Sequence, residues 1–155
     1  MEIKVESKNK KYAETLKKIY TSSFGDLNSF LLYKYENYLF CETDSYFSSN
    51  MNKLSNDSLI HMEIIGRIIS MLGGVPNYNG FVINDIFYND DKEKLLEVDI
   101  RITKEKIILY TKILNEINDN YIKEIITNFI VDERKNLEIL ELLQLRYKKV
   151  KNKQH

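Results

Sequence analysis

The sequence predicts an all-α fold: a four-helix bundle built from two antiparallel helical hairpins joined by a long crossover. Apolar residues recur at three- and four-residue steps along most of the chain, which is the helical period. Glycine and proline are rare, five and one among 155 residues, so an all-β fold would lack its turns. Most of them gather in GGVPNYNG (73–80), which is the one clear break in the chain. Short joints on either side of this break make each pair of helices antiparallel neighbours.

The first hairpin is predicted to consist of helices over about 10–42 and 44–73. The stripe of the first helix is formed by Tyr12, Leu16, Ile19, Phe30, Tyr33 and Phe40. Thr43, Asp44 and Ser45 supply a turn and an N-cap for the second helix. Its stripe is formed by Met51, Leu54, Ile65, Ile68 and Leu72, and Gly73-Gly74 is a helix-end signal.

The second hairpin follows a connection over about 75–89, in which FVINDIFY (81–88) is expected to be a packed crossover loop. Helices are predicted over about 90–117 and 120–150, with a turn at 118–120 between them. The chain length favours one domain, 1–150, and we expect residues 151–155 to form a basic C-terminal tail.

Composition narrows the classes of function. Apolar residues make up 43% of the chain, enough for a core, and 23 basic residues balance 23 acidic ones, which argues against a nucleic-acid binder. Cys41 is the only cysteine, so the chain forms no internal disulfide framework and no thiolate metal cage. No signal-peptide pattern or membrane-length apolar run is visible. A cytoplasmic protein without a membrane partner is the expectation.

Each predicted helix carries a polar residue on its apolar stripe. The candidates for an inward position are Asp26, Ser58, His61, Glu105, Glu133 and Asn136. Three carboxylates and one imidazole near the middle of four helices would point at one axis, where unpaired charge is costly. A divalent metal would remove that cost, and oxygen and nitrogen ligands without sulfur suit iron, manganese or zinc. The candidate ligands are Asp26, His61, Glu105 and Glu133.

A buried hydrogen-bond network is the alternative to a metal site. The same four residues could pair with one another and with tyrosines, because buried charges are either paired or bound to metals. If the site instead holds a metal, Tyr33, Tyr35 or Tyr110 are candidates to donate to the ligands or to quench radicals.

Several segments resemble a known family. KYAETLKKIYTSSFGDL (11–27), HMEIIGRIISMLGGVPNY (61–78), DIRITKEKIILY (99–110) and DNYIKEIITNFIVDERKNLEIL (119–140) resemble the ferritin-like proteins of the rubrerythrin and manganese-catalase group. The likeness is to a small stand-alone type found in anaerobic spore-forming bacteria. It covers nearly the whole chain and implies a ferritin-like four-helix bundle.

The resemblance implies a degenerate two-metal site. The family supplies a Glu, a Glu-x-x-His, a Glu and a second Glu-x-x-His from four helices. These positions fall here on Asp26, on Ser58 to His61, on Glu105 and on Glu133 to Asn136. The first Glu-x-x-His therefore lacks its Glu and the second lacks its His. Losing a carboxylate that bridges the metals weakens the charge compensation that two cations require.

The resemblance accordingly implies at most one iron or manganese ion, with reduced or no reduction of peroxide or oxygen. If the chain is an enzyme, it would be a rubrerythrin- or manganese-catalase-like oxidoreductase with an unknown electron donor. A non-catalytic scaffold or interaction protein without metal is the alternative, and a small-molecule carrier is a third, less favoured reading. We also expect a homodimer formed through the first hairpin, because YKYENYLF (33–40) is rich in aromatic residues.

Overall fold

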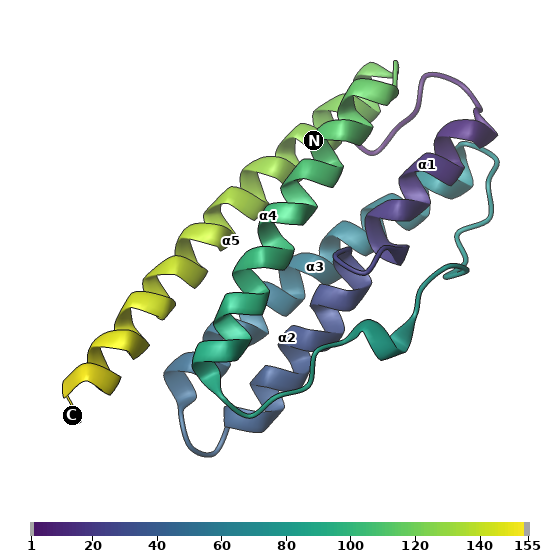
Figure 1. Cartoon of the computed structure of the whole chain (residues 1–155). Helices are drawn as coiled ribbons and strands as arrows, with labels where there is room; N and C mark the ends of the chain where they lie inside the picture. Colours follow the sequence, from purple (N-terminus) through teal and green to yellow (C-terminus); the bar gives the residue numbers. More distant parts are fainter. Residues whose placement is uncertain (1, 154–155) are drawn as a thin grey trace.

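The predicted all-α fold is confirmed by the computed structural model, which describes the backbone of residues 2–153 and the side chains of residues 2–148. The helices are α1 (Lys10–Thr21), α2 (Asp26–Phe40), α3 (Ser45–Met71), α4 (Lys92–Glu116) and α5 (Asn120–Lys153). Figure 1 shows the two hairpins, α2 with α3 and α4 with α5, side by side, with α1 continuing the line of α2.

The first predicted helix is in fact two helices, because residues 22–25 interrupt it. Gly25 lies so close to the end of α1 that an added Cβ would stand 2.6 Å from the carbonyl oxygen of Ile19. The Gly25 carbonyl then accepts the first hydrogen bond of α2, from the Ser29 amide at 3.0 Å. This break makes Asp26 the first residue of α2, where the helix dipole favours a carboxylate.

Helix α3 ends as the sequence predicts, at the pair of glycines. The Gly73 amide donates to Ser70 and the Gly74 amide to Ile69, which is the Schellman arrangement. Gly73 has a φ of 85°, a conformation that glycine adopts at little cost. At Gly74 an added Cβ would stand 2.4 Å from the Cβ of Ala13, so this glycine lets α1 pack directly on the end of α3.

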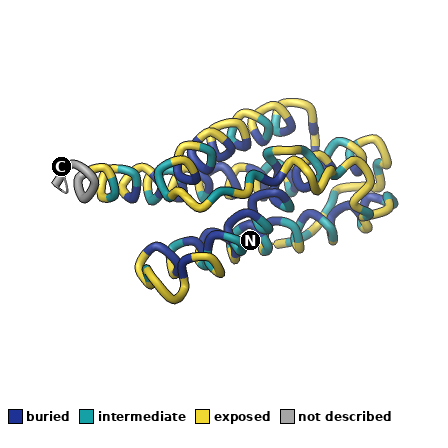
Figure 2. The backbone as a smooth tube through the Cα atoms, turned by 60° about the horizontal axis from the view of Figure 1, so that its bottom comes forward, coloured by how far each residue is buried: buried dark blue, intermediate teal, exposed yellow. Residues whose placement is uncertain are grey.

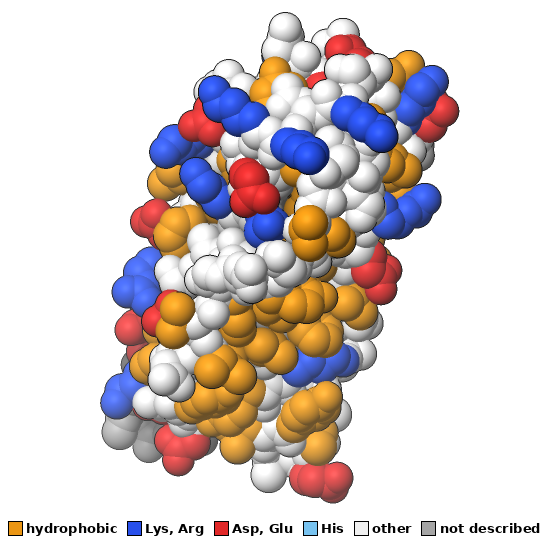
Figure 3. Space-filling model, turned by 90° about the vertical axis from the view of Figure 1, so that its right-hand side faces the viewer, with side chains coloured by type: hydrophobic (Ala, Val, Ile, Leu, Met, Phe, Trp, Pro, Cys, Tyr) orange, Lys and Arg blue, Asp and Glu red, His pale blue; other side chains and the backbone are white. Residues whose placement is uncertain are grey.

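The crossover between the hairpins is not helical apart from the 3-10 turn η1 (Ile83–Asp85). Tyr35 of α2 fixes the C-terminal end of the crossover, because its hydroxyl donates to the Asn89 carbonyl at 2.7 Å. Val82, Ile83 and Tyr88 of this segment are at least half exposed. Figure 3 views the side along which the crossover runs and shows hydrophobic side chains gathered in its lower half.

Helix α5 begins at an N-cap formed by Asp119 and continues beyond residue 150, the predicted end of the domain. Asp119 accepts from the amides of Tyr121 and Ile122 and also from the amide of Glu6, which ties the N-terminal segment to the second hairpin. The helix continues to Lys153, so residues 151–153 of the predicted tail are helical and 154–155 lie outside the described residues. Figure 2 shows the coloured part of α5 already extending beyond the other helices toward the C-terminus. Within residues 2–153, no helix has the length and apolar character needed to cross a membrane.

The interior consists of two apolar clusters, one toward each end of the bundle. On α3 the apolar core residues stop at Leu54 and resume at Ile65, and on α4 they stop at Ile102 and resume at Tyr110. The buried residues between the two clusters are mostly polar. This layer contains Asp26, Asn28, Ser29, Ser55, Ser58, His61, Thr103, Lys106, Glu133 and Asn136.

Candidate functional site

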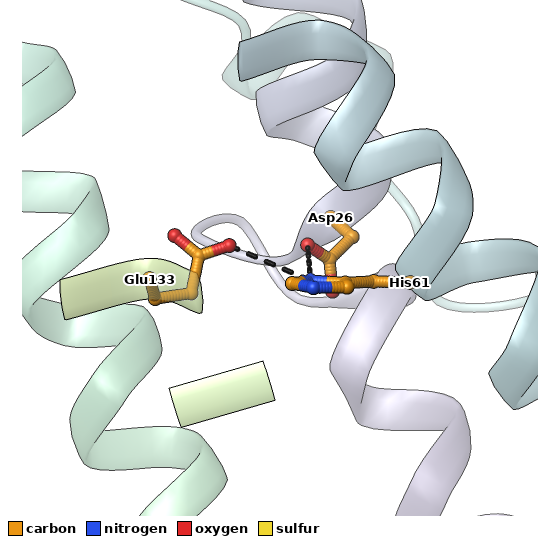
Figure 4. A group of neighbouring side chains, drawn as sticks. All are labelled: Asp26, His61 and Glu133. Atoms are coloured by element: carbon orange, nitrogen blue, oxygen red, sulfur yellow. Dashed lines mark ion pairs between the residues drawn. The ribbon is translucent and has the colours of Figure 1, made fainter. Parts of the chain in front are cut away.

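Three of the four predicted ligand residues meet inside the polar layer. Asp26 comes from α2, His61 from α3 and Glu133 from α5, and each is no more than 1% exposed. The Nδ1 atom of His61 lies 3.4 Å from Asp26 Oδ1 and 3.5 Å from Glu133 Oε1, as Figure 4 shows. Ligand atoms bound tetrahedrally at about 2.1 Å stand about 3.4 Å apart, so these two spacings suit one small cation. The three ligand atoms all lie within 4.8 Å of one another.

The fourth predicted ligand, Glu105, does not join this group. Its side chain is exposed on the outer face of α4, beside a surface pocket that Phe24 and Arg101 also line. The prediction that it faces the axis is wrong by one position, because Lys106 faces the axis instead. The Nζ atom of Lys106 lies 3.4 Å from Asp26 Oδ1 and 3.4 Å from Glu133 Oε1, and the side chain is fully buried.

The reason for the error is the pattern of α4. The stripe that predicts an inward Glu105 is Val98, Ile102, Glu105, Leu109 and Ile113. Ile102 and Ile113 are buried, but Val98 and Leu109, on either side of Glu105, are only half-buried. The side of α4 that faces the bundle axis carries Asp99, Thr103, Lys106 and Tyr110 at steps of three and four residues. Apolar periodicity cannot identify an inward face that is itself polar. It predicts that the neighbouring apolar stripe, which contains Glu105, faces the axis instead.

Aromatic and polar neighbours fix the His61 ring. Its Nε2 atom lies 3.0 Å from Asp132 Oδ2, whose side chain is about half exposed at the rim of the bundle. Phe129 stacks on the ring with centroids 4.0 Å apart. Tyr110 donates a short hydrogen bond to Asp26 Oδ2. A histidine whose outer nitrogen binds a carboxylate has its inner nitrogen directed at the cluster, as in many metal sites.

The charges in the cluster compensate one another. Burial raises the pKa of Asp26, but Lys106, His61 and Tyr110 outweigh it and hold that pKa below its ordinary value. Burial also lowers the pKa of Lys106, but Glu133 and Asp26 outweigh it, so the net shift is upward and the amine stays an ammonium. His61 behaves similarly: despite burial, Asp132 and Asp26 raise its pKa to about 9. Two buried cations thus face two buried carboxyl groups.

The pKa of Glu133 shifts in the opposite direction to that of Asp26. Burial raises its pKa above the ordinary value, and the nearby Asp26 carboxylate adds to the rise, although Lys106 and His61 oppose it. The two carboxyl groups therefore depend on the cation between them, because like charges in a buried site disfavour ionisation.

These residues do not fit a two-metal centre. Ser58 and Asn136 are buried at the level of the cluster, as their register predicts, but neither offers a carboxylate or an imidazole. Among the described residues, the potential metal-binding group consists of Asp26, His61 and Glu133 alone. For a single ion the spacing is suitable, but the two carboxylate oxygens that would bind it are the same two atoms that Lys106 contacts.

A second buried acidic pair lies closer to the α2–α3 turn. Glu36 of α2 is fully buried and Asp99 of α4 is 1% exposed, and the two carboxyl groups interact with each other. No other described group forms a hydrogen bond with their oxygens. Burial raises the pKa of Asp99 to about 7 and, together with the Asp99 charge, raises that of Glu36 well above its ordinary value. The pair is therefore stable in a form that keeps at least one proton.

Apolar periodicity does not identify Lys106, Asp132, Glu36 and Asp99 as members of the polar interior. Of the three tyrosines predicted as neighbours, Tyr110 contacts Asp26, whereas the Tyr33 hydroxyl lies 3.4 Å from that of Thr103. The available signal was the spacing of polar residues themselves. Asp26, Ser29, Tyr33 and Glu36 repeat at helical steps on α2, as do Asp99, Thr103, Lys106 and Tyr110 on α4.

The fold and the site together define a ferritin-like bundle with a buried Asp-His-Glu group that could hold a metal. Wild-type KatB, a manganese catalase from Anabaena, matches with a TM-score of 0.88 and 13% identity, over 96% of this chain and 78% of that one. A second structure of KatB, from Anabaena PCC7120, matches with a TM-score of 0.83 and 13% identity, over 90% and 74%.

The bacterioferritin of Rhodobacter capsulatus, solved with a metal-free dinuclear site and haem iron, matches with a TM-score of 0.71 and 20% identity over 92% of this chain and 89% of that one. No family model matches the sequence, and no curated protein matches it. Likeness at these identities establishes the fold.

Proposed function

We propose that this chain is a non-catalytic ferritin-like protein, whose central site has lost two-metal redox chemistry and binds at most one ion. The observation that carries the proposal is the identity of the residue that α4 supplies to the site. A ferritin-like dimetal centre takes carboxylates from all four helices, and here α4 supplies the ammonium of Lys106. With Asp26, His61 and Glu133 alone, the site has too little negative charge for two divalent cations.

The test is metal stoichiometry combined with turnover. The purified chain is loaded anaerobically with Fe(II) or Mn(II), desalted and analysed for metal, and then assayed for peroxide decomposition beside a manganese catalase. We expect no more than one ion per chain and turnover no faster than that of the free metal. Two ions per chain with catalase or peroxidase turnover would refute the proposal, and the electron donor would then have to be sought.

A metal-free scaffold is the second candidate, and the charge balance favours it. Lys106 and His61 already neutralise the buried carboxylates, so the fold needs no ion to tolerate them. A scaffold of this kind would act in assembly or protein binding, including the spore-related setting that the sequence resemblance suggests. Iron or manganese would then leave the melting temperature unchanged.

Self-association through the first hairpin remains part of the proposal. The bundle itself covers Tyr33 and Phe40 of the aromatic segment 33–40, whereas Tyr38 is 66% exposed. If this hairpin pairs two chains, Tyr38→Glu would place a charge in the interface and shift the mass measured by light scattering from dimer to monomer. An unchanged mass would remove this hairpin as the interface.

A further inference from the structure

We propose that the side chain of Lys106 is a built-in cation that occupies the place of the metal ion and thereby excludes one. This inference rests on the proposed function and deepens it, because it names the residue that determines whether the site binds an ion. It also makes a claim that the proposed function does not: a single substitution at position 106 creates metal binding.

Lys106 and a metal ion would bind the same two carboxylate oxygens. Lys106 Nζ lies at 3.4 Å from both Asp26 Oδ1 and Glu133 Oε1. The same Oδ1 and Oε1 atoms lie at 3.4 Å and 3.5 Å from His61 Nδ1, the third ligand atom that an ion would use. An ion bound by these three atoms would share two of its ligands with the ammonium. The two cations would stand within about 4 Å of each other, where repulsion is strong even at an effective dielectric of about 20.

Burial leaves the ammonium of Lys106 without an alternative position in the folded chain. Its side chain is completely buried at the centre of the bundle, and Thr103 and Tyr110, one turn before and after it on α4, are also completely buried. Buried lysines are rare unless they are paired, and this one is paired with two carboxylates and no others among the described residues. Moving the ammonium to solvent to admit an ion would therefore cost its pairing and leave a void.

The remainder of the site keeps the features of a metal-binding histidine. Asp132 holds Nε2 of His61 at 3.0 Å, so that Nδ1 is directed at the two carboxylates. The three-ligand group is complete and buried, and what it lacks is space and net negative charge. Both are supplied when a side chain without the Nζ ammonium replaces Lys106.

The experiment compares two variants with the wild type and a surface control. Lys106→Met removes the charge and keeps most of the volume, and Lys106→Glu adds a carboxylate on α4. Lys104→Glu makes the same change of charge at an exposed position two residues away on the same helix. Mn(II) is titrated into each protein under anaerobic conditions, and binding is followed by calorimetry, metal content after desalting and melting temperature.

We expect wild type and Lys104→Glu to bind Mn(II) on the order of 100-fold more weakly than Lys106→Glu. Saturating Mn(II) should raise the melting temperature of Lys106→Glu by roughly 5–10 °C, and that of wild type not at all. Lys106→Glu is expected to be destabilised without metal, because three buried carboxyl groups then have only His61 as a cation. Lys106→Met should bind one ion through Asp26, His61 and Glu133 while remaining folded without it.

Two results would overturn the inference. One is a wild-type protein that binds Mn(II) as tightly as Lys106→Met does, because the lysine would then exclude nothing. The other is failure of both variants to gain affinity; if Lys106→Glu does not fold, Lys106→Met alone decides. Neither result depends on redox activity, whereas two ions and peroxide turnover in wild type would refute the proposed function itself.

Discussion

The Glu36–Asp99 pair should make the stability of the fold depend on pH, and Glu36→Gln should reduce that dependence. The folded chain raises the pKa of Asp99 from 3.8 to about 7, and the pKa of Glu36 is raised as well. Folding therefore strengthens proton binding by the pair. The corresponding stability is fully present below about pH 4 and is lost as the pH rises through about 7.

The size of the effect follows from the shift in Asp99. A group with a pKa of about 7 when folded and about 4 when unfolded loses about 2–3 kcal/mol of stabilisation between pH 5 and pH 8. The glutamine that replaces Glu36 cannot ionise, so the variant loses the contribution of Glu36, whereas the contribution of Asp99, which burial causes, remains. We expect Glu36→Gln to lose about 2–3 kcal/mol over this range, less than wild type loses, and to exceed wild type at pH 8.

Urea unfolding followed by circular dichroism at a series of pH values gives these free energies. His61 also contributes to the wild-type slope, because its pKa of about 9 makes its contribution fall between about pH 6.5 and pH 9. That contribution and the contribution of Asp99 are common to both proteins, so the difference between wild type and variant isolates the contribution of Glu36. Glu97→Gln, which removes an exposed carboxylate from α4, serves as the control. Equal slopes in wild type and Glu36→Gln would refute the reasoning.

Three further outcomes are expected. Asp119→Ala removes the cap of α5 and the contact with the N-terminal segment, and should cost about 1–2 kcal/mol in urea unfolding; a loss below the error of the measurement would contradict the role of this cap. Gly74→Ala introduces a methyl group 2.4 Å from Ala13 and should cost about 1–3 kcal/mol, whereas an unchanged midpoint would mean that α1 moves freely. Asp132→Asn removes the first of the groups that raise the pKa of His61, so an NMR titration should show that pKa below about 9. The loss of stability with rising pH that His61 causes should then be smaller and be complete at a lower pH. An unchanged titration would show that Asp132 does not act on the ring.

The sequence predicted the parts of the fold that depend on apolar periodicity and on glycine. The two hairpins, the end of α3 at Gly73-Gly74 and the non-helical crossover are as predicted, because these signals are local. The break before Asp26 was not predicted, since one glycine after two serines is a weak signal within a long apolar pattern. The tertiary structure requires the glycine, because Gly25 approaches the end of α1 more closely than a side chain permits.

The candidate site was predicted where polar residues interrupt an apolar stripe and was mispredicted where the inward face is itself polar. Asp26, His61 and Glu133 belong to the first kind and meet at one point. Lys106 belongs to the second kind, and its neighbour Glu105 on the apolar stripe of α4 was chosen in its place. Burial of a lysine is unfavourable in isolation, so only the positions of its two carboxylate partners explain it.

The polar layer and the Glu36–Asp99 pair both contain two buried carboxyl groups, and the fold compensates their charge in two different ways. A buried pair of carboxyl groups cannot remain doubly ionised without compensation, and the compensation can be a metal ion, a protein cation or a proton. Asp26 and Glu133 use the ammonium of Lys106, whereas Glu36 and Asp99, which have no ion-pair partner among the described residues, retain a proton. The first kind of compensation depends on Lys106 and on His61, whose pKa of about 9 makes its contribution fall above neutral pH. The second depends on pH near neutrality, and Lys106 also lowers the pKa of Asp99, so substitutions at position 106 should perturb both parts of the polar interior.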